Sequence, residues 1–307
     1  METARMEFRL TGLVAATFTP MRDDGSLHLD RVGPMVDRLI ADGIAAFYVC
    51  GSTGEGPLMT VEEREATAAA FVGAAAGRIP VVVQVGHSSL ADARRLAGHA
   101  QTIGADAISA VAPYYFKPDS VAVLVDCLAE IAAAAPELPF YYYHIPSITG
   151  VDLDLGELLR RGAEKLPTLV GIKHTSALMN EAQALRHIAG GRYDVLHGRD
   201  EMLLAGMATG ASGAVGSTYN FAAPLYHRLI IAMDSGDVEE ARRCQGLSVA
   251  MIHGILKGWG QAGLKATMSL VGPDCGPTRL PLVSLSPEQT TELRRSLESI
   301  GFFDWGR

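Results

Sequence analysis

The 307-residue sequence lacks the features of a membrane-spanning, secreted or nucleic-acid-binding protein. Its 26 lysines and arginines are outnumbered by 34 acidic residues, and a net charge of −8 argues against nucleic acid as a partner. Its longest apolar runs end well short of the ~20 residues that a membrane helix needs. The N-terminal stretch METARMEFRLTG carries acidic residues and no apolar core. We therefore expect neither a signal peptide nor a membrane segment.

Cysteine is also scarce, and its positions form no recognisable pattern. The four cysteines, Cys50, Cys127, Cys244 and Cys275, are scattered without a C-x-x-C pair, unlike a disulfide framework or a zinc site. We expect reduced thiols and a cytoplasmic protein. Hydrophobic residues at 48% and charged residues at 20% fit a compact folded chain. There is no low-complexity tract and no flexible linker.

Short apolar runs alternate with amphipathic helical stretches along most of the chain. Eight such runs at roughly 25–35 residue intervals predict an α/β fold, a (β/α)8 TIM barrel. A doubly wound open sheet is the alternative, but it more often has about six strands. The predicted strands are 13–18, 45–50, 81–85, 107–112, 139–143, 168–172, 193–197 and 212–216.

The strand pattern stops after about residue 235, and three helical stretches follow. They begin near residues 237, 262 and 286, the last at a Ser-Pro start. We interpret residues 1–235 as the barrel that carries the active site, and residues 236–307 as a C-terminal three-helix extension packed on the barrel. The extension is expected to serve packing or oligomer formation rather than catalysis.

Reactive groups of a TIM barrel stand at the carboxyl ends of its strands, and one lysine fits that rule. The chain has only five lysines, and Lys173 directly follows the apolar run 168–172. Partial loss of water lowers the pKa of a lysine and frees a neutral amine, which can attack a ketone to form a Schiff base. The alternative is an ordinary ion pair with Asp200 or Glu201.

Tyr143 ends the neighbouring predicted strand, where its phenol could relay protons beside Lys173. The alternative is that it only packs, since three tyrosines run together in PFYYYH.

The motif GSTGEG at residues 51–56 has neither the dinucleotide spacing G-x-G-x-x-G nor the lysine of a phosphate loop. Its exposed backbone N–H groups and the hydroxyls of Ser52 and Thr53 could hold a carboxylate. It could also be a plain turn before a helix.

Acidic and histidine side chains at the later strand ends allow two further interpretations. Asp200 and Glu201 could accept hydrogen bonds from sugar hydroxyls or could simply begin a helix. His144, His174 and His197 suggest a metal site, but strand alternation turns His144 and His174 away from Tyr143 and Lys173. We therefore predict no metal.

Six motifs at the predicted strand ends resemble, in this order, those of the N-acetylneuraminate lyase family. That family belongs to the wider group of Schiff-base aldolases that includes dihydrodipicolinate synthase. The resemblance covers nearly the whole chain, and the fifth-strand and eighth-strand motifs are close to animal-type sialic acid lyases. The motifs are GSTGEG (51–56), PYYFKP (113–118), FYYYHIPSITG (140–150), GIKHTS (171–176), HGRDE (197–201) and GAVGSTYN (213–220).

The resemblance implies a role for each matching residue. Lys173 matches the Schiff-base lysine, Tyr143 the proton-relay tyrosine, and Ser52 with Thr53 the pair that grips the substrate carboxylate. Tyr115 matches a tyrosine that reaches the site of a neighbouring subunit. A homotetramer built as a dimer of dimers, without metal or organic cofactor, is also implied. The positions that match those holding the sugar's hydroxyl chain are Thr175, Gly198, Asp200, Glu201 and Ser217.

One departure from the wider group bears on the substrate. Dihydrodipicolinate synthases carry an arginine where this chain has Ile148, so a second substrate carboxylate would lose its partner. The resemblance thus implies reversible cleavage of N-acetylneuraminate to pyruvate and N-acetylmannosamine. Three alternatives stay open: a related pyruvate-dependent aldolase or dehydratase, including a dihydrodipicolinate synthase-like enzyme; a non-catalytic barrel that only binds ligand; and a metal-dependent hydrolase.

Overall fold

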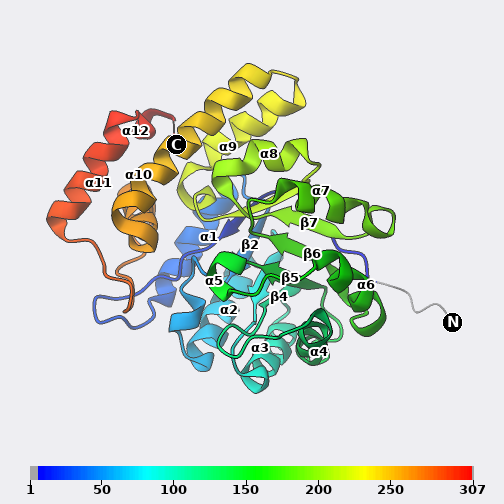
Figure 1. Ribbon diagram of the computed structural model, residues 1–307. Coiled ribbons are helices and arrows are strands. Elements are labelled where there is room, and N and C mark those ends of the chain that lie inside the picture. The colour runs from blue at the N-terminus through cyan, green and yellow to red at the C-terminus, as the bar shows by residue number, and fades with distance from the viewer. Residues whose placement is uncertain (1–5, 306–307) are drawn as a thin grey trace.

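The computed structural model describes residues 6–305, and its centre is a closed barrel of eight parallel strands in chain order (Figure 1). The predicted TIM barrel is confirmed, and the open-sheet alternative is wrong. The strands are β1 (Gly12–Ala16), β2 (Ala46–Val49), β3 (Val81–Gln84), β4 (Ala107–Val111), β5 (Phe140–His144), β6 (Leu169–His174), β7 (Asp194–His197) and β8 (Gly213–Gly216). Residues 1–5, part of the stretch from which no signal peptide is expected, lie outside the described residues.

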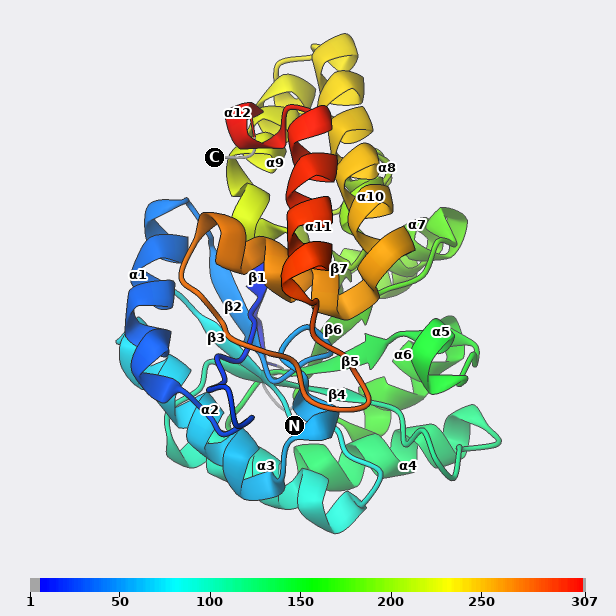
Figure 2. The ribbon, with the colours of Figure 1, turned by 90° about the vertical axis from the view of Figure 1, so that its left-hand side faces the viewer.

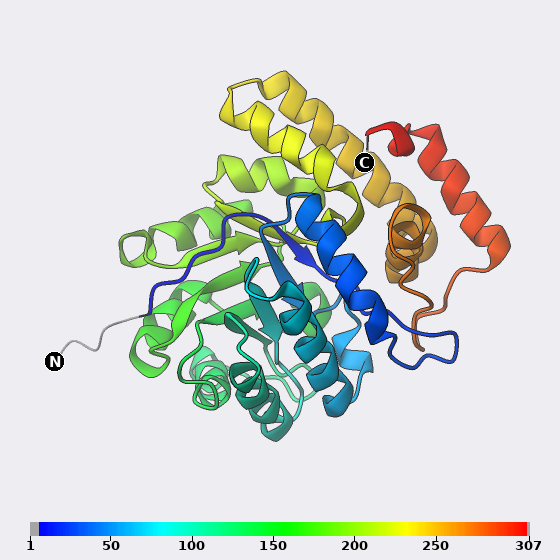
Figure 3. The same ribbon diagram turned by 180° about the vertical axis from the view of Figure 1, so that it is seen from behind.

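Helices surround the barrel (Figures 1 and 3). Several start at side-chain caps that the sequence supplies: Thr60 forms a capping box with Glu63, and Ser89 and Ser120 cap the two helices that follow β3 and β4. The helices are α1 (Val32–Ala41), α2 (Val61–Ala75), α3 (Leu90–Thr102), α4 (Val121–Ala132), α5 (Pro146–Thr149), α6 (Leu155–Lys165), α7 (Met179–His187), α8 (Leu203–Ala208) and α9 (Tyr219–Asp234).

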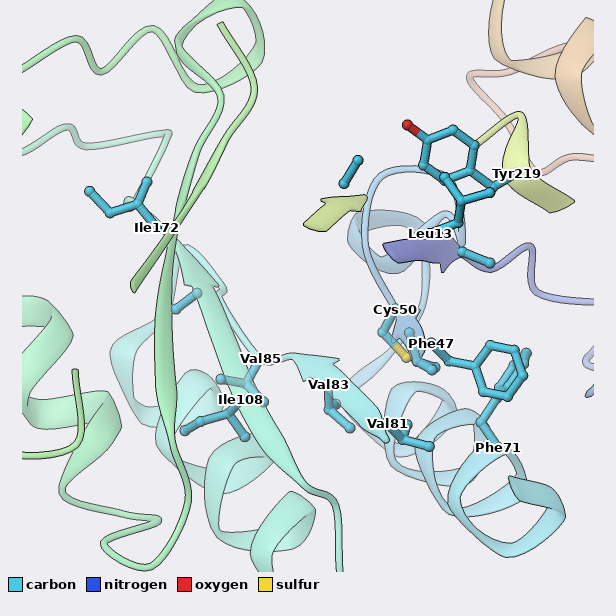
Figure 4. Close-up of a cluster of buried hydrophobic side chains, with 14 of the residues drawn as sticks. Leu13, Phe47, Cys50, Phe71, Val81, Val83, Val85, Ile108, Ile172 and Tyr219 are labelled. Carbon is cyan, nitrogen blue, oxygen red and sulfur yellow. The ribbon is translucent and has the colours of Figure 1, made fainter. Parts of the chain in front are cut away.

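Two apolar cores follow from the alternation of side chains along the strands. Val14, Tyr48 and Val82 are among the side chains that fill the barrel interior. Their neighbours in sequence point outward and pack under the helices, as Phe47 does against Phe71 (Figure 4). The parity of a residue along its strand therefore decides whether it faces the barrel interior or the helices.

Three helices follow the barrel: α10 (Val238–Val271), α11 (Pro287–Ser299) and α12 (Phe302–Trp305). Gly260, with φ of 52°, interrupts α10, so its two halves match two of the three predicted helices. Ser286 and Gln289 form the capping box that starts α11, as the Ser-Pro pattern indicates, whereas α12 was not predicted. The α10 helix packs along α9, and α11 packs along α10 (Figure 2). Among residues 6–305, no helix is both long and apolar enough to cross a bilayer.

Candidate active site

Lys173 lies inside the barrel, one step before the carboxyl end of β6. The strand extends two residues further than predicted, and its register pairs Lys173 with Tyr143 of β5. The side chain of Lys173 is 4% exposed, with its Nζ atom 3.9 Å from the ring centre of Tyr143 and 3.8 Å from that of Tyr48. The amine is thus enclosed between two aromatic rings.

The environment of Lys173 favours the neutral amine. Burial lowers its pKa to about 7, while the negative charge of Asp200 acts in the opposite direction. Within the described part of the chain, no carboxylate lies within ion-pair distance of Nζ. The alternative of an ion pair between Lys173 and Asp200 or Glu201 is therefore wrong. A lysine of this kind can act as a nucleophile near neutral pH.

Tyr143 is buried, and burial raises the pKa of its phenol. The nearby hydroxyls of Ser52 and Thr175 work against that effect. The Thr175 hydroxyl is buried and has no hydrogen-bond partner among residues 6–305. Tyr143 therefore keeps its proton at neutral pH and is bordered by two other hydroxyl groups, a suitable arrangement for a proton relay.

Tyr48 is a part of the site that the sequence reasoning missed. Its ring meets that of Tyr143 edge to face at 5.6 Å, and its hydroxyl donates to Ser109 Oγ at 2.9 Å. The signal was available in principle, because Tyr48 occupies the inward parity of β2, but a tyrosine inside an apolar run reads as a packing residue.

The GSTGEG loop after β2 has a strained backbone, with left-handed φ values of 57° at Glu55 and of 60° at Cys50, the residue directly before the loop. Ser52 is exposed toward solvent, whereas Thr53 is buried and its hydroxyl lies 2.5 Å from Ser217 Oγ in the loop after β8. A side chain at Gly56 would place its Cβ 2.0 Å from the Cys50 carbonyl oxygen, so only glycine fits there. The loop is built with one particular shape rather than as a generic turn.

Helix α10 and the segment that follows it hold this loop in place. Lys265 Nζ donates to Glu55 Oε1 and to the Pro277 carbonyl, each at 2.7 Å, and both partners of the ion pair are buried. Gln261 Nε2 donates to the Thr53 carbonyl at 3.1 Å, and the Arg279 backbone N–H donates to Glu55 Oε2 at 2.9 Å. The sequence reasoning assigned this helix to packing and missed its contacts with the site.

The five residues predicted to hold the sugar chain line one cavity of about 160 Å³. Ile252, Leu256 and Leu264 of α10 supply its apolar wall. A larger hollow of about 550 Å³ opens at the amino end of β6 and contains none of the predicted reactive side chains. The predicted residues that the cavity brings together are Thr175, Gly198, Asp200, Glu201 and Ser217.

The two acidic residues are already engaged within the protein. Asp200 Oδ2 accepts from the Thr218 backbone at 2.8 Å and from its hydroxyl at 2.6 Å, and burial raises the Asp200 pKa to about 6. Glu201 accepts from the Arg199 guanidinium at 2.7 Å. Thr218 and Arg199 were not among the predicted site residues. Asp200 thus braces the loop after β8 and also contributes charge near Lys173.

Only glycine fits at position 198 without displacing its neighbours. A Cβ at this position would lie 2.1 Å from Thr175 Oγ1 and 2.9 Å from the His174 carbonyl.

Tyr115 lies apart from these residues. It is 76% exposed on the loop after β4, where its ring packs edge to face on Phe116. Ile148, on α5, is 71% exposed. The two histidines that follow Tyr143 and Lys173 are fully buried outside the barrel interior, as strand alternation predicts, while His197 contacts the Arg199 carbonyl.

Comparison with known proteins adds to this geometry. Residues 9–300 match the profile of the Dihydrodipicolinate synthetase family. The N-acetylneuraminate lyase of Xenopus tropicalis is 42% identical over 287 residues, which cover 91% of this chain and 93% of that protein. The structure is similar to N-acetylneuraminate lyase from Aliivibrio salmonicida (TM-score 0.94, 37% identity, 98% of this chain and 100% of that one). It is also similar to that from Proteus mirabilis (TM-score 0.93, 38% identity, 96% and 100%).

Proposed function

Because this chain belongs to the dihydrodipicolinate synthetase family, we propose that it is a Schiff-base aldolase that cleaves N-acetylneuraminate reversibly to pyruvate and N-acetylmannosamine. The observation that carries the proposal is the enclosure of the Lys173 amine between the rings of Tyr48 and Tyr143, with its pKa lowered to about 7. The similarity to N-acetylneuraminate lyases of vertebrates and bacteria supports the choice of substrate.

In the proposed reaction, Lys173 supplies the electron sink. Its neutral Nζ bonds to C2 of the open-chain keto acid, and loss of water from the adduct leaves a protonated imine. When the C3–C4 bond breaks, its electron pair moves toward the imine and forms an enamine. Protonation of C3 and hydrolysis then release pyruvate and free the lysine. The lysine imine itself accepts the electron pair of the broken bond, so the proposed reaction needs no metal or organic cofactor.

Tyr143 is proposed to carry the proton of the C4 hydroxyl. Because burial raises its pKa, the phenol is protonated at neutral pH and does not act as a base on its own. It must therefore pass on its own proton as it accepts another. We infer that the phenol passes its own proton to the substrate carboxylate. When the phenol then protonates C3 of the enamine, the carboxylate returns that proton to the phenol. The hydroxyls of Ser52 and Thr175 lie near the phenol and are proposed to hydrogen-bond with it during the relay.

The remaining predicted residues would orient the substrate. Ser52 and Thr53 are proposed to bind the C1 carboxylate with their hydroxyls and the backbone N–H groups of the strained loop. The hydroxyl chain of the sugar would enter the cavity lined by Thr175, Gly198 and Ser217. There Glu201 would exchange part of its contact with Arg199 for a sugar hydroxyl.

A dihydrodipicolinate synthase-like activity is less well supported by the residues of the site. Its second substrate carboxylate would need a cationic partner, and the matching position holds the apolar and exposed Ile148. A related aldolase for another sugar acid stays as the second candidate. Comparing pyruvate release from N-acetylneuraminate with release from other keto sugar acids separates the two.

The covalent step can be tested directly. Borohydride added with pyruvate should reduce the imine and leave a stable adduct on Lys173, which peptide mass analysis locates. A protein that binds pyruvate without forming any adduct would show that the pocket only binds ligand. Activity that disappears with a chelator would instead favour the metal-dependent hydrolase.

Three further features are part of the proposal. We infer a homotetramer arranged as a dimer of dimers, in which Tyr115 contributes to a neighbouring site. A cytoplasmic location fits the four cysteines, none of which forms a disulfide. We also keep the division of the chain into a barrel of residues 1–235 and a helical extension of residues 236–307, with the addition that the extension supplies one wall of the cavity.

A further inference from the structure

Two buried histidines stand side by side on the outer surface of the barrel wall. His144 at the end of β5 and His174 at the end of β6 are register partners, and each directly follows one of the proposed catalytic residues, Tyr143 and Lys173. Their rings are stacked with centres 5.6 Å apart and planes 25° apart, and neither residue is exposed. The proposed aldolase reaction uses neither of them.

The hydrogen bonding of this pair is incomplete. Among the described residues, His174 Nε2 meets Glu181 Oε2 at 2.8 Å, but His174 Nδ1 and both ring nitrogens of His144 have no partner. A buried polar atom without a partner is costly. The described residues therefore leave these buried ring nitrogens unused, and imidazole nitrogens are common metal ligands.

Two carboxylates complete the surroundings of the histidine pair. One ligand atom each of His144, His174 and Glu181 lie within 4.8 Å of one another. Asp152 Oδ1 lies 3.8 Å from His144 Nε2. The side chains of Glu181 and Asp152 are 27% and 67% exposed, so both stand at the solvent side of the histidines. The cluster is buried at its nitrogen end and open at its oxygen end, which gives an ion a path of entry.

We propose that His144, His174 and Glu181, with Asp152 as a fourth ligand, form an accessory site for a zinc-like divalent transition metal. Two imidazoles with carboxylates suit zinc, cobalt or nickel better than magnesium or calcium, which prefer oxygen ligands alone. This inference departs from the sequence prediction of no metal, because Glu181 lies on another element and the sequence pattern did not pair it with the histidines. It does not depend on the proposed aldolase activity.

The geometry also predicts the strength of binding. Ligand atoms of a tetrahedral zinc ion lie roughly 3.3 Å apart, so the exposed carboxylates of Glu181 and Asp152 must rotate inward. Neither histidine has an outer-shell acceptor at Nδ1 among the described residues. Loss of such support weakens metal binding by about 10–100-fold, so we expect micromolar rather than nanomolar affinity. A bound ion would tie α7 and the segment after β5 to the strands that carry Tyr143 and Lys173.

Metal content of the untagged, chelator-treated protein after dialysis against micromolar Zn²⁺ tests the proposal. We expect about one equivalent of zinc for the unmodified protein, and binding weakened at least about 10-fold by Glu181→Gln and, to a lesser degree, by Asp152→Asn. Both variants change partly exposed side chains, so folding should persist. Glu164→Gln, an exposed glutamate near the end of α6, His253→Gln and Cys127→Ser are matched controls that should bind as the unmodified protein does.

A second readout separates a specific site from scattered weak binding. Added zinc should raise the melting temperature of the unmodified protein and of Glu164→Gln, but not that of Glu181→Gln, since a ligand of the folded state alone stabilises it. The proposal is overturned if no zinc binds at micromolar concentration. It is equally overturned if Glu181→Gln and Asp152→Asn retain full affinity and the full thermal shift.

Discussion

Lys173 can react as an amine only to the extent that the protein keeps water away from it. The rings of Tyr48 and Tyr143 exclude solvent from Nζ, and their π faces, at 3.8 and 3.9 Å, still tolerate the ammonium form. With a pKa of about 7, the lysine is divided between the two forms near neutral pH. The neutral form can attack a ketone, and the charged form is favoured by the negative charge of Asp200.

The pH dependence of imine formation follows from this balance. The rate of borohydride-trapped imine should rise with pH, with a midpoint near 7, because only the neutral amine attacks. The charge of Asp200 raises the Lys173 pKa, so Asp200→Asn should move the midpoint to lower pH. A rate that is flat between about pH 5.5 and 9, or a midpoint that rises in Asp200→Asn, would contradict this account.

Burial of Lys173 should also reduce the stability of the protein. Its pKa is lower in the folded than in the unfolded state, so the destabilisation is complete below about pH 7 and fades as pH rises toward the unfolded value of 10.5. Lys173→Met should therefore raise the melting temperature, by more at pH 6 than at pH 9. Thermal unfolding at the two pH values measures the difference. An equal gain in melting temperature at both pH values would mean that burial does not disfavour the charged form of Lys173 in the folded protein.

Replacement of Tyr143 tests the relay. Tyr143→Phe should lower kcat by roughly 10²–10⁴, the usual range for a lost acid–base group, while trapping of the pyruvate imine continues. Tyr142→Phe is the matched control, because Tyr142 lies on the same strand but packs in the outer core. Steady-state kinetics of both variants, with the trapping assay beside them, decide the matter. Full turnover in Tyr143→Phe would remove the residue from the mechanism.

At the scale of elements, the site depends on a helix far along the chain as well as on the strand ends. The GSTGEG loop carries a left-handed residue, Glu55, which is held by Lys265 of α10. Breaking a buried ion pair by removing one partner typically costs about 3–5 kcal/mol, because the other charge is left alone. The second half of α10 is thus expected to fix the shape of the loop that presents Ser52 and Thr53.

Lys265→Met should destabilise the fold and weaken carboxylate binding. We expect the KM for substrate to rise more than kcat falls, since the loop positions the carboxylate and not the reacting bond. The double variant Lys265→Met with Glu55→Gln should recover part of the stability. The exposed pair of α6 is the control: Arg161→Met should change the free energy of unfolding by no more than about 0.5 kcal/mol. Denaturant unfolding and substrate kinetics measure both effects, and an unchanged KM in Lys265→Met would refute the positioning role.

At the scale of the whole molecule, local patterns and distant contacts differ in how well they can be predicted. All eight strands were found within a few residues, because each is a short apolar run bounded by turn residues. The inward parity of Tyr143 and Lys173 followed from the same pattern. The pairing of Lys265 with Glu55, 210 residues apart, could not be found this way, since it depends on how α10 packs across the loop. The same holds for Glu181 beside the two histidines.

Assembly is the remaining property at this scale, and Tyr115 makes it testable. An aromatic pair with Tyr115 76% and Phe116 86% exposed is unusual on an isolated chain and suits a subunit contact. Sedimentation equilibrium should give a mass of four chains of 32.6 kDa each. Tyr115→Phe removes only the hydroxyl, so the tetramer should persist while kcat falls, if that hydroxyl reaches the Tyr143 relay of a neighbouring subunit. Tyr115→Ala should weaken the assembly as well, because the ring that would be buried in the subunit contact is lost. A fully active monomer would show that each barrel works alone and that Tyr115 has no part in a neighbouring site.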